Sequence, residues 1–394
     1  MLITEWLMHN YGNEQYTPGL CRIRAALDEL LPSFKKTKII IIAGTNGKGE
    51  TTLRLSELLN QHTQCVWTSP HIERLTERMR DQAGEIGLSE LQALIDKCHQ
   101  VVLQKKLNLT FYEFLFFVFC SWAEAKKPEF LLLEVGLGGR LDAVNVFDAD
   151  YVLLPSISRD HQEFLGNRYD LILEEKLGVL RPHSTLISFL DLKYLRERAQ
   201  KKSLELGARY VDLEELSPVP SCDFSRRNQL LSYAAYLLLK DRGLHELKNA
   251  PVDRAGLEHR GEIFTRGADW HLFGSHNVDG MRKLIQFLRS GTYTFSRPPF
   301  DAVIVAFSRR DPGDLQVMLR MLKANGPGKV IMTTFDHPKA ADKSLVESLC
   351  HQEGMEFADN VETYVQGKNE GQVLVTGSYY FLGHFKSLLR RRST

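Results

Sequence analysis

The chain has 394 residues, of which 43% are hydrophobic and 25% are charged, a composition typical of an ordinary globular protein. This length exceeds what one hydrophobic core usually serves, so we expect two domains. The 50 basic residues nearly balance the 49 acidic residues, and the net charge of +1 argues against a large nucleic-acid-binding surface.

The cysteine pattern and the apolar runs point to a cytoplasmic protein. Six cysteines are scattered without a C-x-x-C pair or metal-ligand spacing, as expected for small buried residues in a reducing compartment. The N-terminus lacks the basic-then-apolar pattern of a signal peptide. The longest aromatic and apolar run, Phe114 to Cys120, is too short to span a bilayer, so no membrane partner is expected.

A glycine-bracketed turn with one lysine follows the first apolar run, in Ile39-Ile-Ile-Ile-Ala-Gly-Thr-Asn-Gly-Lys-Gly-Glu-Thr-Thr52. The pattern predicts a strand, a phosphate loop and a helix, in which the glycines bring backbone N–H groups close to an anion. Lys48 is placed to neutralise phosphate charge. The strict G-x-x-x-x-G-K-[ST] pattern fails, because Ile42 replaces its first glycine and Gly49 follows the lysine. The alternative is an ordinary strand-to-helix turn.

Strands and helices alternate along the first part of the chain, which predicts βαβ units and a parallel sheet. The polar stretch from Ser69 to Arg80 is too broken for a core element and reads as an excursion near the site. Periodicity predicts helices over residues 18–31, 88–103, 110–125, 169–180 and 228–240, and strands over residues 39–42, 64–68, 130–135, 151–157, 185–189 and 209–211.

A second, smaller α/β domain is expected after a linker at residues 249–256. We therefore predict domains over residues 1–256 and 257–394. In the second domain the pattern predicts strands over residues 262–265, 270–273, 302–306, 330–333 and 373–376, and helices over residues 278–288, 315–322, 344–350 and 381–389.

Polar side chains follow the ends of several predicted strands of the first domain: Lys48, Ser69, Glu134, Asp160 and His161. The carboxyl ends of parallel strands are where such sheets bind ligands, so these side chains should converge. Glu134 closes an apolar strand, and Mg²⁺ is a natural partner for it beside a phosphate loop.

Each of these residues also has a structural interpretation. Glu134 could simply reach solvent, and a lone histidine such as His161 is usually structural. Lys176 could be a solvated lysine in a charge cluster. In the second domain Arg260, His276, Asn277 and Asp311 stand near strand ends and could equally be surface residues.

Several ordered motifs resemble the folylpolyglutamate synthase/dihydrofolate synthase family of the Mur ligase superfamily, across nearly the whole chain. The most specific is Leu133-Glu-Val-Gly-Leu-Gly-Gly-Arg-Leu-Asp142. The others are Ala43-Gly-Thr-Asn-Gly-Lys-Gly49, Thr68-Ser-Pro-His71 with Glu77-Arg78, Thr110-Phe-Tyr-Glu113, Asn145, Asp160-His161 with Leu165-Gly166, and Glu175-Lys176 with Gly178.

The resemblance implies a Mur-ligase-like P-loop domain with a helix-flanked parallel sheet and a Rossmann-like C-terminal α/β domain. It implies ATP binding by Gly44, Thr45, Asn46, Gly47, Lys48, Gly49, Glu50, Thr51, Arg260, His276, Asn277 and Asp311. It implies Mg²⁺ binding, by up to two ions, at Ser69, Glu134, His161 and Lys176, the last being a lysine that this family often carries carbamylated. Substrate contacts are implied for Pro70, His71, Arg78, Phe111, Glu113, Asp142 and His337.

The implied reaction adds L-glutamate to dihydropteroate, to folate or to both. Transfer of the γ-phosphoryl group of ATP to the carboxylate makes an acyl phosphate, which the glutamate amine attacks. Lys48, Mg²⁺ and Arg260 fit the neutralisation of charge, and His161 or Asp160 could accept the amine proton; Lys176 belongs to the same catalytic set. The implied partners are small molecules, and the family is commonly monomeric.

Departures from the family pattern keep two alternatives open. Glu50 stands where Ser or Thr is usual, and a carboxylate there should repel phosphates unless it points away or Thr51 supplies the hydroxyl. Phe273 and Val278 replace an aspartate and a proline, and His259 replaces a glycine. The alternatives are a ligase of the same superfamily for another carboxylate, and a nucleotide- or folate-binding paralogue with weakened catalysis.

Overall fold

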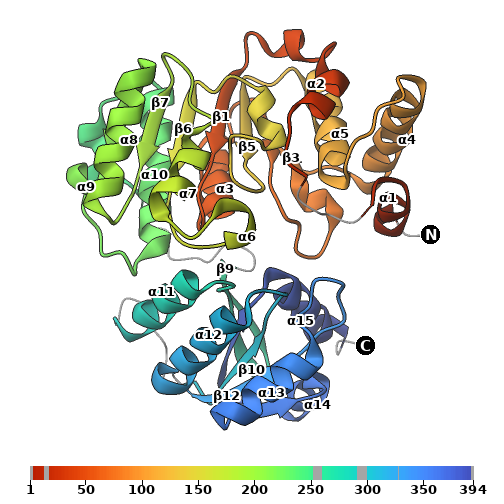
Figure 1. Ribbon diagram of the computed structural model, residues 1–394, viewed down its shortest axis with the longest axis vertical. Coiled ribbons are helices and arrows are strands. Elements are labelled where there is room, and N and C mark those ends of the chain that lie inside the picture. Colours follow the sequence, from red (N-terminus) through yellow and green to blue (C-terminus); the bar gives the residue numbers. More distant parts are fainter. Residues whose placement is uncertain (1–2, 13–16, 252–259, 291–299, 327, 392–394) are drawn as a thin grey trace. The chain divides into compact units, whose positions relative to one another are not determined.

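The computed structural model describes residues 3–12, 17–251, 260–290, 300–326 and 328–391 (Figure 1). Two compact units are formed, one by Met1–Val219 with Ser225–Val252 and one by Pro220–Phe224 with Asp253–Thr394. The boundary predicted between residues 256 and 257 falls among residues 252–259, which lie outside the described part. None of the described helices has the length and apolar character needed to cross a membrane.

The first unit is built on one sheet in the order β4-β3-β2-β5-β1-β6-β7-β8. Strands β2 through β8 in this order run parallel, while β3 and β4 add antiparallel pairs at one edge. The bounds are β1 Lys38–Ile42, β2 Gln64–Trp67, β3 Met79–Asp81, β4 Gly84–Glu85, β5 Phe130–Glu134, β6 Tyr151–Leu154, β7 Thr185–Ser188 and β8 Arg209–Asp212.

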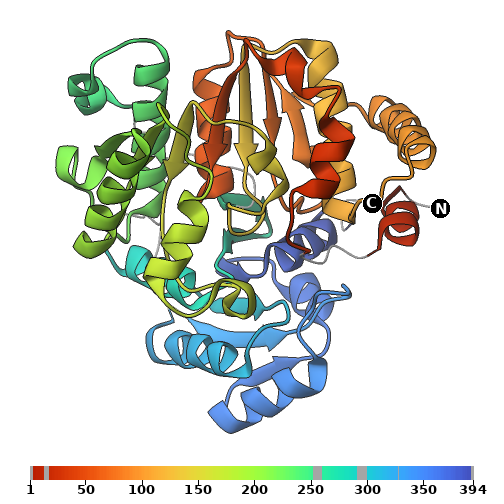
Figure 2. The ribbon, with the colours of Figure 1, turned by 45° about the horizontal axis from the view of Figure 1, so that its top comes forward.

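Helices cover both faces of this sheet (Figure 2). Side chains alternate along β1, so Ile39 and Ile41 pack in one core cluster and Ile40 and Ile42 in the other. The helices are α1 Ile3–Tyr11, α2 Cys21–Leu27, α3 Lys48–Leu58, α4 Leu88–Gln104, α5 Phe111–Lys126, α6 Gln162–Leu165, α7 Tyr169–Leu177, α8 Lys193–Leu206, α9 Leu213–Leu216 and α10 Phe224–Leu239. Short 3₁₀ helices span Leu31–Phe34, Leu75–Arg78, Ala143–Val146 and Leu244–Asn249.

The aromatic run of α5 forms much of the core on one face. Phe116 and Phe119 are fully buried, and their rings lie 5.4 and 5.5 Å from the ring of Trp67 on β2. This packing of aromatic rings across a helix and a strand buries a large apolar area, which is the main source of stability in such a core.

Phe116→Ala is expected to lower the free energy of unfolding of the first unit by about 3–5 kcal/mol, because it leaves a cavity that the surrounding rings cannot close. Urea denaturation followed by circular dichroism measures the change. Leu103→Ala is the matched control, since Leu103 lies on neighbouring α4 with 56% exposure and its truncation should cost no more than about 0.5 kcal/mol. Equal effects of the two substitutions would contradict this assignment of the core.

The second unit carries a sheet in the order β13-β12-β11-β14-β10-β9, in which only β9 runs antiparallel to its neighbour among the described pairs. Its strands are β9 Arg260–Arg266, β10 Ala268–Gly274, β11 Ala302–Ala306, β12 Lys329–Thr333, β13 Glu356–Ala358 and β14 Gln372–Gly377. Its helices are α11 Val278–Arg289, α12 Pro312–Asn325, α13 Lys343–Glu353, α14 Val361–Gly367 and α15 Tyr379–Arg391.

The predicted α/β class and the predicted strands are confirmed within one to three residues at most ends. The predicted parallel sheet is confirmed, and antiparallel strands β3, β4 and β9 are added at the sheet edges. The excursion after Ser69 contributes one of these strands, β3, because Met79 packs fully buried in the core. The helix predicted over residues 18–31 is shorter, and α1, α8, β13 and α14 were not predicted.

Candidate functional site

The phosphate loop lies between β1 and α3 and is strongly curved. Gly44 and Gly47 have φ angles of 155° and 86°, which favour glycine. A Cβ atom on Gly44 would lie 3.0 Å from the ring of Pro155, so a larger residue does not fit there. Lys48 begins α3, and its Nζ donates to the carbonyl of Thr45 at 3.2 Å. The loop is thus closed by its own lysine at a helix N-terminus, the arrangement that binds anions.

The segment after β6 holds this loop through hydrogen bonds. Thr45 Oγ1 donates a hydrogen bond to the Ser158 carbonyl at 3.1 Å and accepts one from the Ser158 N–H at 3.0 Å. Asn46 N–H donates to Ser156 Oγ at 2.9 Å, and Ser156 Oγ donates back to the Asn46 carbonyl at 2.8 Å. The Ser156 contacts were not foreseen, although this residue follows a strand end as the predicted site residues do.

The Glu50 carboxylate is paired with side chains of α3 and α10. Glu50 is only 4% exposed and accepts hydrogen bonds from Arg54, Ser225 and Asn228. Arg54 therefore compensates the charge of this carboxylate. Thr51, the alternative hydroxyl, is fully buried, and its Oγ1 has no hydrogen-bond partner among the described residues.

Glu134 and Ser69 lie together at the carboxyl ends of β5 and β2. Glu134 is 3% exposed, which rules out the solvent-reaching interpretation, and its Oε2 accepts a hydrogen bond from Ser69 N–H at 3.0 Å. Ser69 Oγ is buried and makes no hydrogen bond of ordinary geometry with described residues. A buried carboxylate beside a buried hydroxyl oxygen gives two hard donors, which fits a Mg²⁺ ion that takes its other ligands from water and phosphate.

Asp160 and His161 follow β6 as predicted. Asp160 is buried and its Oδ1 accepts a hydrogen bond from His161 N–H at 3.1 Å. The His161 side chain is 50% exposed, and its Nδ1 lies 3.8 Å from Glu163. The described residues contain no group of three or more His, Cys, Asp or Glu side chains that could hold a metal ion, so a metal role for His161 stays a prediction.

Lys176 on α7 is 3% exposed, so its interpretation as a solvated lysine is wrong. Its Nζ donates to the carbonyl of Gly44 in the phosphate loop at 2.9 Å. Burial, reinforced by the positive charge of Lys48, lowers the pKa of Lys176 to about 7, against the opposing effect of Asp160. The structure therefore brings a readily deprotonated amine to the base of the loop.

The glycine-rich run after Glu134 packs closely on α7. A Cβ on Gly139 would lie 2.9 Å from the Lys176 carbonyl, so only glycine fits. Asp142 closes the run, because it accepts hydrogen bonds from the N–H groups of Gly136 and Leu137 at 3.0 Å and from Tyr112 Oη at 3.2 Å. Burial raises the pKa of Asp142 to about 6. These contacts organise the loop, and a substrate contact of Asp142 stays a prediction.

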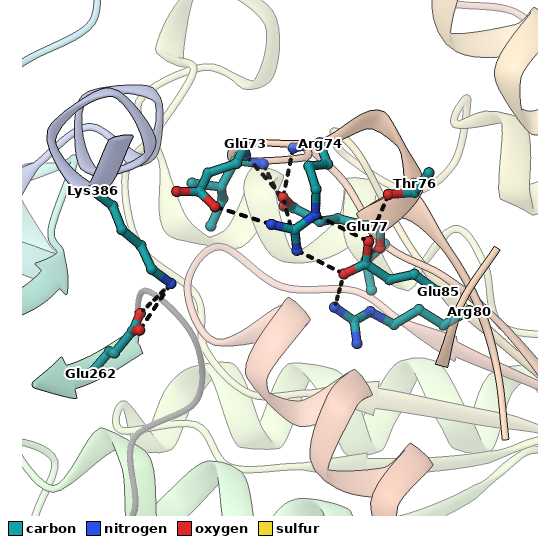
Figure 3. A network of polar contacts seen from close by, with 10 residues as sticks. Glu73, Arg74, Thr76, Glu77, Arg80, Glu85, Glu262 and Lys386 are labelled. Carbon is teal, nitrogen blue, oxygen red and sulfur yellow. Dashed lines mark hydrogen bonds and ion pairs between the residues drawn. The ribbon is translucent and has the colours of Figure 1, made fainter. Parts of the chain in front are cut away.

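The excursion after β2 is a structured loop held by charged side chains (Figure 3). Glu77 accepts hydrogen bonds from the N–H groups of Ile72, Glu73 and Arg74 at 2.7, 3.0 and 2.7 Å. Arg74 also donates to Glu85 at 3.0 Å, as does Arg80 at 2.9 Å. Burial alone would raise the pKa of Glu85, but the hydrogen bonds from Arg74 and Thr76 outweigh it and hold this pKa below its usual value.

The predicted substrate residues of the first unit are placed mainly by contacts with one another and with helix ends. Arg78 is fully buried, donates to His71 Nδ1 at 2.8 Å and lies over the ring of Phe111. Glu113 closes a capping box with Thr110 and pairs with Arg22 at 3.0 Å. Pro70 follows Ser69 through a cis peptide bond. Their substrate contacts stay predictions.

Four of the predicted residues of the second unit, His276, Asn277, Asp311 and His337, follow the carboxyl ends of its strands. Asn277 caps α11 by accepting from Gly280 N–H at 2.8 Å, with His276 before it, and Asp311 caps α12. The His337 ring stacks on Tyr380 with centroids 4.4 Å apart. Arg260 begins β9, and its side chain, like all of His259, lies outside the described residues. Phe273, which replaces the usual aspartate, is a buried core residue.

Comparison with known proteins gives one consistent picture. No family model matches the chain. The chain is 27% identical over 418 residues to the dihydrofolate synthase/folylpolyglutamate synthase of Bacillus subtilis, covering 95% of each protein. It is 35% identical over 223 residues to the Haemophilus influenzae protein of the same name, covering 53% of this chain and 49% of that relative.

Solved structures of such proteins share the fold over almost the entire chain. Escherichia coli FolC in complex with DHPP and ADP superimposes with a TM-score of 0.81 and 22% identity, covering 99% of this chain and 98% of that one. The ligand-free Yersinia pestis bifunctional folylpolyglutamate synthase/dihydrofolate synthase gives a TM-score of 0.78 at 25% identity, covering 98% of each chain.

The sequence motifs, the geometry of the loop and the full-length match agree with one another. Over nearly its whole length this chain is similar to proteins of the folylpolyglutamate synthase/dihydrofolate synthase family.

Proposed function

We propose that this protein is an ATP- and Mg²⁺-dependent ligase that joins L-glutamate to the carboxylate of dihydropteroate or of a folate. The observation that carries the proposal is the convergence of a closed phosphate loop, the Ser69–Glu134 pair and buried Lys176 at one edge of a parallel sheet. Its relatives supply the substrate class: a bifunctional folylpolyglutamate synthase/dihydrofolate synthase was solved with Mn, AMPPNP and L-glutamate bound.

The chemistry needs two steps. A carboxylate oxygen of the pterin substrate attacks the γ-phosphorus, the bond to the β-phosphate oxygen breaks, and ADP leaves. The glutamate nitrogen then attacks the acyl carbon, the bond to the phosphate oxygen breaks, and phosphate leaves with that oxygen. The amine proton must be accepted, and Asp160 or His161 is our candidate base.

The protein's part in these steps is positioning and charge neutralisation. Loop N–H groups and Lys48 would hold the phosphates, and Ser69 and Glu134 would hold a divalent ion. When bound, such an ion offsets the charge of the transferring phosphoryl group. The Gly44 carbonyl accepts the Lys176 hydrogen bond, so the loop is also held from α7.

An isotope experiment tests whether the reaction passes through an acyl phosphate. With a pterin substrate labelled with oxygen-18 in its carboxylate, one labelled oxygen should appear in each phosphate released, as measured by mass spectrometry. Unlabelled phosphate alongside amide formation would exclude an acyl phosphate and favour a different ligase mechanism.

We also propose that Lys176 becomes carbamylated. Its pKa of about 7 leaves much of the amine neutral near pH 7, and a neutral amine can add to CO₂, forming an N–C bond and releasing one proton. The carbamate would place an anionic oxygen donor beside the Gly44 carbonyl, suited to a second Mg²⁺ ion.

Turnover should therefore rise with pH through about 7 and respond to bicarbonate at about pH 6.5, because only the deprotonated amine reacts. Carbon-13 NMR with labelled bicarbonate should show a carbamate signal that Lys176→Ala removes. The lowered pKa of Lys176 also affects folding. Between about pH 7 and the ordinary pKa of 10.5, the lysine keeps its proton in the unfolded chain and lacks it in the folded protein, so the free energy of unfolding rises with pH. Activity independent of bicarbonate, with no carbamate signal, would contradict the modification.

The remaining parts of the proposal concern its setting. We propose a monomer that acts in the cytoplasm on small molecules alone. A ligase for another carboxylate or a binding paralogue is less well supported, since the two departures that suggested weakened catalysis have structural explanations: Glu50 is ion-paired with Arg54, and Phe273 fills a core position.

A further inference from the structure

Glu50 is a buried carboxylate in the first turn of α3, two residues after the loop lysine. The resembled family has a small hydroxyl residue at this position, so the reaction itself does not explain it. Arg54 Nε donates to Glu50 Oε1 at 2.9 Å, and Ser225 Oγ donates to the same oxygen at 2.8 Å. Asn228 Nδ2 donates to Oε2 at 2.8 Å. Both carboxylate oxygens are occupied, so the orientation of the group is fixed.

These contacts join two helices that are distant in sequence. Arg54 is itself buried and also donates to Ser225 Oγ at 3.3 Å, so the start of α3 is tied to the start of α10. A buried ion pair is retained only when its charges are matched and its remaining polar atoms are bonded. Here the partners come from α3 and from α10, which makes the cluster a defined joint between them.

Asn228 connects this cluster to the phosphate loop. A Cβ atom placed on Gly47 would lie 2.6 Å from Asn228 Oδ1 and 2.9 Å from its Nδ2. The carboxamide of Asn228 therefore lies directly against the backbone of Gly47, the left-handed residue that precedes Lys48. Glu50 holds the nitrogen of this carboxamide and so decides which way it faces.

The charge of Glu50 is compensated within the cluster. With Arg54 at 2.9 Å, the pair acts on a distant phosphate as a dipole rather than as a lone negative charge, and its repulsion falls off correspondingly fast. The Glu50 carboxylate can therefore hold its partners near the loop without strongly repelling an anionic ligand.

We propose that Glu50 is a positioning residue for the phosphate loop, acting through Asn228 on Gly47. The inference rests on the proposed function in one respect only, that the loop binds nucleotide phosphates. Removing the carboxylate frees the Asn228 carboxamide, so the loop loses the packing that holds its N–H groups in one arrangement.

The test compares ADP affinity with stability in three variants. Glu50→Ala should weaken ADP binding about tenfold and raise the KM for ATP by a similar factor with kcat nearly unchanged, since it removes a buried acceptor that acts before the chemistry. Glu50→Gln keeps an oxygen for Asn228 and loses the charge for Arg54, so its melting temperature should fall while its ADP affinity stays within about threefold of wild type. A purely structural role predicts that affinity and stability change together.

Asn228→Ala tests the same path without disturbing the ion pair. It should weaken ADP binding as much as Glu50→Ala does, and the double variant should be no worse than either single variant, because both act on one contact. If Glu50→Ala does not fold, this variant still decides the matter. Wild-type ADP affinity in folded Asn228→Ala would overturn the proposal.

Asp212→Asn is the matched control. It breaks the pair of Asp212 with Arg196 at 3.1 Å, on β8 at the far edge of the same sheet. Its stability should fall while its ADP affinity stays at the wild-type value; a loss of affinity here would show that any broken ion pair disturbs the loop and would overturn the specific role of Glu50. ADP binding is measured without the other substrates, so a wild-type protein that binds ADP but forms no amide would contradict the proposed function and leave this test intact.

Discussion

Replacement of Lys48 by alanine should reduce kcat/KM for ATP by about 10³-fold or more in the glutamate-dependent release of phosphate. The ammonium group is held at the loop by the Thr45 carbonyl and neutralises charge that develops during phosphoryl transfer, where one removed donor typically costs about 10²–10³. Loss of this cation should also raise the pKa of Lys176, because the charge of Lys48 is one of the two causes that lower it.

The matched control lies on the same strand. Lys38 begins β1 and forms a mostly exposed pair with Asp150 at 3.0 Å, at the opposite end from the loop. Lys38→Ala should keep wild-type turnover, and both variants should unfold within about 1 kcal/mol of wild type. A Lys48→Ala enzyme with near-normal turnover would remove the loop from the active site.

Replacement of Glu134 by alanine is the second change with a large expected effect. We expect turnover to fall about 10³-fold or more, since the substitution removes the buried carboxylate that would hold the divalent ion. The variant should stay folded. Its melting temperature should no longer rise when Mg²⁺ is added to the ADP-bound protein.

Glu129→Ala provides the comparison for this variant. Glu129 directly precedes the same strand, is exposed and pairs with His62 at 2.8 Å. It should retain both turnover and the Mg²⁺-dependent stabilisation. Equal responses of the two variants to Mg²⁺ would place the metal elsewhere.

The sequence predicted the fold class and the edge of the sheet that carries the site, because both follow from local pattern. Apolar runs that end in polar residues mark parallel strands, and the order β2-β5-β1-β6 brings Ser69, Glu134, the loop and Asp160 side by side. The register of β1 on β5 places Ile42 opposite Glu134, which aligns the strand ends.

What the sequence could not predict depends on partners distant in the chain. From the sequence, Glu50 was expected to repel phosphates. The structure shows that Ser225 and Asn228 of α10, about 170 residues later in the chain, donate hydrogen bonds to it. Lys176 looked solvated because its neighbours are charged, yet packing of the glycine-rich run buries it against Gly44. Helix α8 was missed because most of its residues are polar and its buried stripe is narrow, with Leu195, Ala199 and Ser203.

The central claim is the formation of an amide from a pterin carboxylate and L-glutamate at the expense of ATP. The most direct measurement incubates the wild-type protein with ATP, Mg²⁺ and L-glutamate, adds dihydropteroate or tetrahydrofolate, and follows released phosphate together with the product by mass spectrometry. We predict phosphate release that requires both glutamate and a pterin, with one amide formed per phosphate. Tight ADP binding without turnover on either pterin would contradict the claim and favour the binding paralogue.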